Sequence, residues 1–139
     1  MTALTLSLLL QVSAVSATST EGNHYAKAYE TMVSTGQPLV VLVGAEWCPA
    51  CQQMKNSIIP QVKSQGGLDE VAFAYVNTDA DHSLAGKLMQ GGSIPQLIVY
   101  SKAPDGWKRE QLTGAHGAEE TKTFIGRAHR RLFPRLTNR

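Results

Sequence analysis

The most constraining feature of this sequence is a pair of cysteines, Cys48 and Cys51, that closely follows a short apolar run. Residues 39–43 are all apolar and lie between a proline and a glycine, which predicts a strand covered on both faces. From the first cysteine the apolar spacing becomes helical, through Cys51, Met54, Ile58 and Val62. Pro49 occupies the first turn of this helix, where its missing N–H costs nothing. The sequence therefore places the cysteine pair where a buried strand gives way to a helix.

The other predicted elements alternate between helix and strand. The first is a helix whose inner face is formed by Tyr25, Ala28, Tyr29, Met32 and Val33. The later ones are a strand at 71–76, a helix at 84–89, a strand at 97–100, its hairpin partner at 107–113 and a helix at 119–133. We also expect Pro60 to end or bend the helix that begins at Cys48. A chain of 139 residues forms one domain, so this order predicts an α/β fold: a central mixed sheet of about four strands with helices on both faces.

The first 17 residues carry no charged side chain and end in the small residues Ser16 and Ala17. This is typical of a secretory signal peptide cleaved after Ala17, although no basic residue stands beside Met1. The stretch is too short and too rich in Ser and Thr to span a bilayer comfortably. The alternative is a buried first helix or strand. We predict a signal peptide at 1–17, a single mature domain at 18–139, and export, to the bacterial periplasm, where disulfides persist.

The net charge of the chain does not indicate a class of binding partner. Its formal net charge is +2 and its pI is near 8.6, which is too mild to indicate a nucleic-acid-binding protein. Basic residues do gather at the C-terminal end, at Arg127, Arg130, Arg131, Arg135 and Arg139. Cations are favourable at the end of a helix without any ligand, so the default role is a solvated basic end. Contact with an acidic partner or an anionic membrane surface is the sharper alternative.

The spacing of the two cysteines suits disulfide exchange. At the start of a helix, the unpaired N–H groups and the helix dipole favour a thiolate at Cys48, and the thiolate is the attacking species. Cys51, one turn later on the buried face, would resolve the mixed disulfide. The alternatives are an inert disulfide or half of a metal site. Zinc needs two more ligands and the histidines are scattered singly, while haem attachment needs a His where Gln52 stands, so we predict no metal.

Three motifs carry a resemblance to a known family. The first is the run from Pro38 through Trp47-Cys48-Pro49-Ala50-Cys51, which resembles the active-site strand and helix start of the thioredoxin superfamily. The second is Ser93-Ile94-Pro95-Gln96-Leu97, which resembles the loop before the next strand of that family. The third is Gly114-Ala115, which resembles the turn into its last helix. The resemblance spans about residues 24–133 and is strongest to short exported thioredoxin-like proteins. It implies a thioredoxin-like fold and a cis Ile94–Pro95 bond facing the cysteines.

The same resemblance implies how a client would bind. The backbone of Ile94 would pair with an extended client segment, Pro95 would shield the sulfurs, and Trp47 would offer an apolar contact beside Cys48.

The sequence departs from the thioredoxin pattern at two buried positions. Leu42 stands where thioredoxins place an acid, and Tyr75 stands where the neighbouring strand commonly supplies a lysine. The proton of Cys51 must then go to water, to Glu46 or to the client. The dipeptide Pro49-Ala50 between the cysteines, which tunes the redox pair, differs from the usual Gly-Pro and leaves open whether clients are reduced, oxidised or isomerised.

The sequence thus predicts a thiol–disulfide oxidoreductase with Cys48 and Cys51 as its catalytic residues. Its partners would be protein or peptide clients and a redox partner protein, with no nucleic acid and no stable membrane insertion after leader cleavage. No cofactor is needed because the electrons travel on sulfur. The rival is a thioredoxin-fold binding or chaperone module with a structural disulfide. A peroxide-reducing enzyme is a weaker third option, because neither Thr nor Arg stands near Cys48 in the sequence.

Overall fold

Strand β1 (Leu39–Gly44) forms the centre of the fold, and all six of its residues are buried. It pairs in parallel with β2 (Ala72–Asn77) on one side and antiparallel with β3 (Gln96–Ala103) on the other. β3 continues into an antiparallel hairpin with β4 (Gly106–Thr113), which gives the strand order β2-β1-β3-β4. This is the mixed four-stranded sheet that the sequence predicts.

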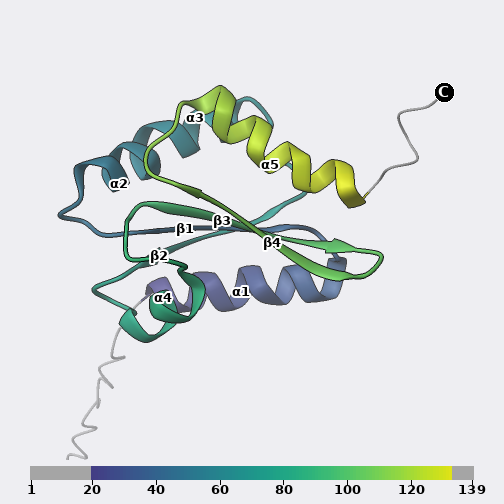
Figure 1. Cartoon of the computed structure of the whole chain (residues 1–139), viewed down its shortest axis with the longest axis horizontal. Coiled ribbons are helices and arrows are strands. Elements are labelled where there is room, and N and C mark those ends of the chain that lie inside the picture. The colour runs from purple at the N-terminus through teal and green to yellow at the C-terminus, as the bar shows by residue number, and fades with distance from the viewer. Residues whose placement is uncertain (1–19, 133–139) are drawn as a thin grey trace, which may run out of the picture.

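Helices cover both faces of this sheet (Figure 1). On one face, α1 (Thr20–Thr35) and α4 (His82–Leu88) pack against alternate β1 side chains such as Val41 and Val43. On the other face, the π-helical turn η1 (Met54–Ile58), α3 (Ile59–Ser64) and α5 (Ala118–Leu132) pack against Val40 and Leu42. The short helix α2 (Pro49–Gln53) precedes η1 on this face (Figure 1) and packs Cys51 against Gly44 at the end of β1. The predicted α/β, thioredoxin-like architecture is confirmed.

The structure is a computed structural model, and it describes residues 20–132. The predicted signal peptide at 1–17 therefore lies outside the described residues, as do Arg135 and Arg139 of the basic C-terminal end. Within the described part, no helix is both long and apolar enough to cross a membrane. The same residues contain no group of three or more side chains placed to hold a metal ion.

The helix does not end at Pro60, as one of the two predicted outcomes had it, but runs past it through α3. Just before the proline the helix widens into η1, in which the N–H of Ile59 bonds to the carbonyl oxygen of Met54. This wider turn gives the proline ring room that a regular α-helical turn would deny it. The extra residue also shifts the buried face by one position, so that Ile59 is buried and the predicted Ile58 is only partly buried.

The predicted inner face of α1 is also partly wrong. Ala28 and Met32 are buried and Tyr25 is half-buried, but Tyr29 and Val33 are 49% and 60% exposed. Tyr29 and Val33 each follow a buried residue, Ala28 or Met32, by one position, which places them about 100° further round the helix. The buried stripe is therefore narrower than the apolar pattern. In α5, by contrast, the apolar residues Phe124, Ile125 and Ala128 are all buried.

Candidate active site

Cys48 and Cys51 form a disulfide at the start of α2, with their Cα atoms 5.2 Å apart. Cys48 is the N-cap of the helix, and its Sγ accepts a hydrogen bond of 3.2 Å from the backbone N–H of Cys51. Cys48 is 6% exposed, whereas Cys51 is fully buried. In the reduced pair, the same N–H and the helix dipole would stabilise negative charge on Cys48, so the more accessible sulfur is also the better nucleophile.

Gly44, the last residue of β1, allows the buried cysteine to approach the sheet. A Cβ added at Gly44 would lie 2.9 Å from the Cβ of Cys51 and 3.1 Å from its Sγ. It would also lie 3.5 Å from a ring carbon of Tyr75. Strand β1 and helix α2 can therefore pack this closely only because residue 44 has no side chain. Sequence reasoning treated Gly44 as the end of a strand and missed this role.

The structure brings the Ile94–Pro95 loop to the cysteine pair. Ile94 packs on a small cluster of Ala45, Cys48 and Cys51, and the Ile94–Pro95 peptide bond is cis. Pro95 is buried, and its carbonyl oxygen accepts a 2.8 Å hydrogen bond from the N–H of Gly114. The three segments that carry the family resemblance, far apart in the sequence, thus meet in one place.

Trp47 is the most exposed of the large apolar residues in the described chain, at 69%. Its indole N–H donates a 2.9 Å hydrogen bond to the carboxylate of Asp79, in the loop after β2. The backbone N–H of Asp79 in turn bonds to the side chain of Asn77 at 2.9 Å. The indole is therefore held in place with much of its surface open to a partner. Asp79 was not predicted, because it lies 32 residues from Trp47 in the sequence.

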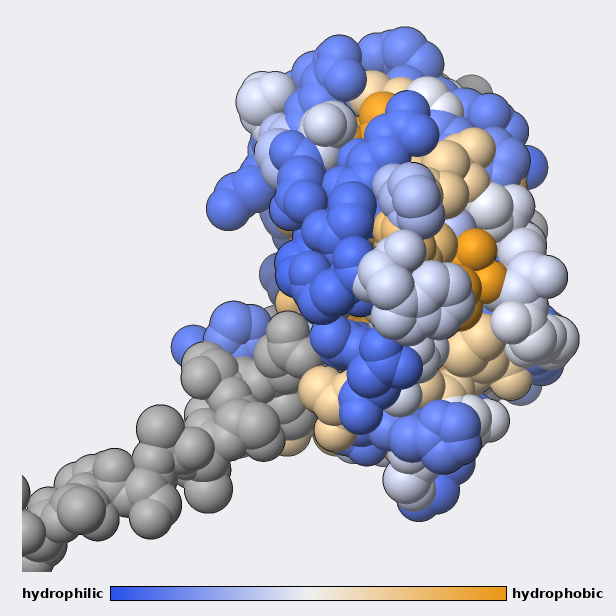
Figure 2. Space-filling model, turned by 90° about the vertical axis from the view of Figure 1, so that its left-hand side faces the viewer, coloured by the Kyte–Doolittle hydropathy of each residue, from blue (hydrophilic) through white to orange (hydrophobic). Residues whose placement is uncertain are grey.

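Figure 2 shows the end of the molecule that carries the β1–α2 loop, which lies at the left of Figure 1. Apolar and weakly polar side chains gather on one half of this end, beside a band of strongly hydrophilic ones. Between the cysteines, Pro49 is exposed and Ala50 is half-buried. The two residues between the cysteines therefore add no charge to this end of the molecule.

Glu46 is a poor candidate for the base that accepts the Cys51 proton. Its carboxylate is exposed and receives a 2.8 Å hydrogen bond from the ammonium of Lys55. That hydrogen bond is the main reason why the pKa of Glu46 is lowered, which weakens it as a base. The same ammonium lies 4.2 Å from the centre of the Tyr75 ring. Leu42, fully buried and paired in register with Tyr75, supplies no acid there.

His116 lies beside η1 and is not among the residues that pack on the two sulfurs. Its backbone N–H contacts the sulfur of Met54 at 3.4 Å. Its two ring nitrogens face the carbonyl oxygen of Thr113 and the carboxylate of Glu120, each at 3.0 Å. The Thr113 carbonyl is the largest cause that raises the pKa of His116, and Glu120 adds to it. The geometry favours the doubly protonated ring, which anchors the start of α5.

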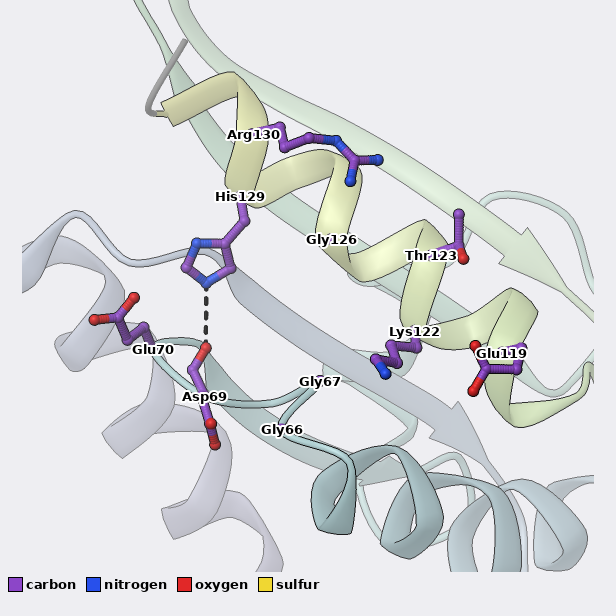
Figure 3. A pocket seen from close by; sticks show the side chains of 10 residues that line it. All are labelled: Gly66, Gly67, Asp69, Glu70, Glu119, Lys122, Thr123, Gly126, His129 and Arg130. Atoms are coloured by element: carbon purple, nitrogen blue, oxygen red, sulfur yellow. Dashed lines mark hydrogen bonds between the residues drawn. The ribbon is translucent and has the colours of Figure 1, made fainter. Parts of the chain in front are cut away.

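A separate hollow of about 440 Å³ lies between α5 and the loop before β2 (Figure 3). Its wall mixes cationic and anionic side chains, among them Lys122, Arg130, Glu70 and Glu119. His129 reaches across it to the carbonyl oxygen of Asp69 at 3.2 Å, which ties the loop to the helix. None of the residues around the disulfide lines this hollow. It therefore lies outside the candidate active site.

Comparison with known proteins agrees with this geometry. The sequence profile of the thioredoxin family, described as "Thioredoxin", matches residues 21–127. A thioredoxin from Thermus thermophilus superposes with a TM-score of 0.61 at 21% identity, covering 74% of this chain and 82% of that one. The chloroplast thioredoxin z also gives 0.61, at 17% identity, covering 88% and 98%. A thioredoxin from Fasciola hepatica gives 0.56 at 23% identity, covering 75% and 93%. A search of curated sequences found no match.

The chain belongs to the thioredoxin family, since the family profile covers most of its length. The solved thioredoxins share its fold. Together with a cysteine pair that can form a disulfide, family membership supports thiol–disulfide oxidoreductase chemistry in general terms.

Proposed function

We propose that this protein exchanges disulfides with protein clients through Cys48 and Cys51. The observation that carries the proposal is the position of Cys48 at the N-cap of α2, where its sulfur accepts a hydrogen bond from the N–H of Cys51 and packs in a small apolar cluster with Ile94. The thiolate of Cys48 attacks one sulfur of a client disulfide, which forms a mixed disulfide and releases the other client sulfur as a thiolate. Cys51 then attacks Cys48 and releases the second client sulfur.

These two steps transfer two electrons from the cysteine pair to the client, which leaves Cys48 and Cys51 as a disulfide. The proton of Cys51 passes to water or to the departing client thiolate. Client oxidation is the same sequence in reverse, and the potential of the pair relative to the client sets the direction. A partner redox protein restores the pair. In this scheme Trp47 and Ile94 contact the client, Pro95 covers the sulfurs, and Pro49 and Ala50 tune the pair.

The proposal is tested by insulin reduction in the presence of dithiothreitol. Wild-type protein should accelerate precipitation of the insulin B chain well above background, and Cys48→Ser should abolish the acceleration. Trp107→Ala is a suitable control, since it alters an exposed aromatic residue in the β3–β4 hairpin and should leave turnover unchanged. Wild-type turnover at the level of dithiothreitol alone would instead support the rival, a binding or chaperone module with a structural disulfide.

We also propose that the protein works outside the cytoplasm, in the bacterial periplasm, because residues 1–17 have the pattern of a signal peptide. Expression of the full chain in a bacterium should yield a periplasmic protein whose first residue is Thr18, as read by N-terminal sequencing. An uncleaved protein confined to the cytoplasm would contradict this location.

A further inference from the structure

The loop between α4 and β3, residues 89–95, presents Ile94 to the cysteine pair but contains no helix or strand of its own. Residues 90–93 are exposed and include Gly91 and Gly92, and Gly91 has φ +82°. A segment of this composition loses much conformational freedom when it is fixed, so it needs specific contacts to hold one shape.

Gln96, the first residue of β3, supplies several of those contacts. Its side chain is fully buried. The two hydrogens of the amide nitrogen are shared among the carbonyl oxygens of Gln90, Gly91 and Ser93, which lie 3.0, 3.3 and 2.9 Å from the nitrogen. The amide oxygen accepts from the N–H of Gln90 at 3.3 Å. One buried amide group thus satisfies backbone groups along the loop that leads to Ile94.

The neighbouring strand β4 reinforces this arrangement. Gln111 donates to the carbonyl oxygen of Gln90 at 3.1 Å, and Arg109 donates to that of Leu88 at 2.8 Å. Arg109 also donates to the side chain of Gln111 at 2.7 Å. We call Gln96, Gln111 and Arg109 the amide clamp. Of the three, only Gln96 binds the carbonyl oxygens of Gly91 and Ser93, which follow Gln90 toward Ile94, so it is the central member.

We propose that Gln96 is a positioning residue that sets client affinity. This inference rests on the proposed function, in which the backbone of Ile94 pairs with an extended client. Because the clamp fixes the loop before the client arrives, binding does not have to order it. Loss of the clamp should therefore weaken client binding and leave the exchange chemistry at Cys48 and Cys51 unchanged.

The decisive variant is Gln96→Met, which keeps the length of the side chain and removes its hydrogen bonds. We expect the KM for insulin to rise about tenfold, since the client must then order the loop, with kcat changed by less than about twofold. The equilibrium constant of the cysteine pair with glutathione should also stay within about twofold of wild type. Ser101→Ala is the matched control: Ser101 lies on the same strand, and in the described structure its buried hydroxyl has no hydrogen-bond partner.

A second variant, Gln96→Glu, adds a pH dependence that loss of packing alone would not produce. An ionised carboxylate only accepts hydrogen bonds, so it repels the three carbonyl oxygens, whereas a protonated one can donate to one of them. Its KM relative to wild type should fall as the pH is lowered from 8 to 5.5. The relative KM of Gln96→Met should stay constant over the same range.

The outcomes separate this inference from the proposed function. If the wild type turns over insulin and a folded Gln96→Met protein has the same KM as the wild type, the inference alone is overturned. A fall in kcat or a shifted glutathione equilibrium at constant KM would also overturn it, because the clamp would then act on the cysteines. Absence of wild-type turnover would overturn the proposed function and the inference with it.

Discussion

The two sides of the candidate site are built by different forces. The cysteine side consists of β1 and α2, and Cys51 is held there by close apolar contact with Gly44 and the buried core. The facing loop that presents Ile94 is irregular and is held by side-chain amides that bind its backbone. Apolar packing thus fixes the sulfurs, whereas polar contacts fix the loop that the proposed function assigns to client binding.

The most damaging change on the cysteine side should be Gly44→Val. Its Cβ would overlap Cys51, so the strand or the helix start must move, at a cost of about 3 kcal/mol in the free energy of unfolding. Urea denaturation of the oxidised protein measures this loss, and insulin turnover should fall with it.

Gly86→Ala is the matched control for that experiment. Gly86 lies within α4, and a Cβ there would contact nothing within 4 Å. Alanine should stabilise the helix by about 0.5–1 kcal/mol. Equal destabilisation by both substitutions would show that Gly44 has no special packing role.

The next largest effect is expected at Trp47, the exposed residue before Cys48, where substitution should change the KM for insulin. Trp47→Ala removes an indole that is 69% exposed. Because the proposed function places this indole against the client, the KM for insulin should rise about tenfold. Asp79→Ala removes only the acceptor that orients the indole, and should raise KM about threefold. Trp107→Ala, far from the cysteines in the hairpin, should leave KM unchanged; an equal rise there would point to nonspecific loss of apolar surface.

A smaller effect is expected at Glu46. Its exposed carboxylate is paired with Lys55 and has a lowered pKa, so Glu46→Gln should change insulin turnover at neutral pH by less than about twofold. A tenfold loss of kcat, with its pH profile shifted, would show that Glu46 does take the Cys51 proton.

The smallest effect should be a pH dependence of stability at His116. Its pKa is raised above the ordinary value of 6.5, mainly by the Thr113 carbonyl, so protonation stabilises the folded state. This contribution is fully present below pH 6.5 and is lost as the pH rises through the folded-state pKa. The stability of the wild type relative to His116→Gln should therefore decline between pH 6 and pH 8, as measured by thermal unfolding. A constant difference would contradict the assigned contacts.

The apolar side of the site could be predicted from the sequence because its signals are local. Five consecutive apolar residues predicted the buried strand, and the cysteine spacing with Pro49 predicted the helix start. The same local reasoning failed where the helix changes its period. No residue pattern marks η1, so Ile58 was assigned to the face that Ile59 occupies.

The polar contacts could not be predicted, because they depend on how distant segments meet. Asp79 approaches Trp47 only after β2 has paired with β1, and Gln111 reaches Gln90 only through the β3–β4 hairpin. In the sequence, Gln96 stands in the loop motif just before the strand predicted at 97–100, and no pattern there marks it as a hydrogen-bonding residue. A buried glutamine at the end of an exposed loop becomes informative only when the carbonyl oxygens around it are known.

The central claim is that Cys48 attacks the client and Cys51 resolves the intermediate. The most direct test starts from the reduced Cys48→Ser and Cys51→Ser variants. Each is incubated with insulin that has its disulfides intact, and the products are examined by nonreducing electrophoresis and mass spectrometry. The account predicts that Cys51→Ser accumulates a mixed disulfide through Cys48 and that Cys48→Ser, whose remaining sulfur is buried, accumulates none. Equal accumulation by both variants would contradict the assignment.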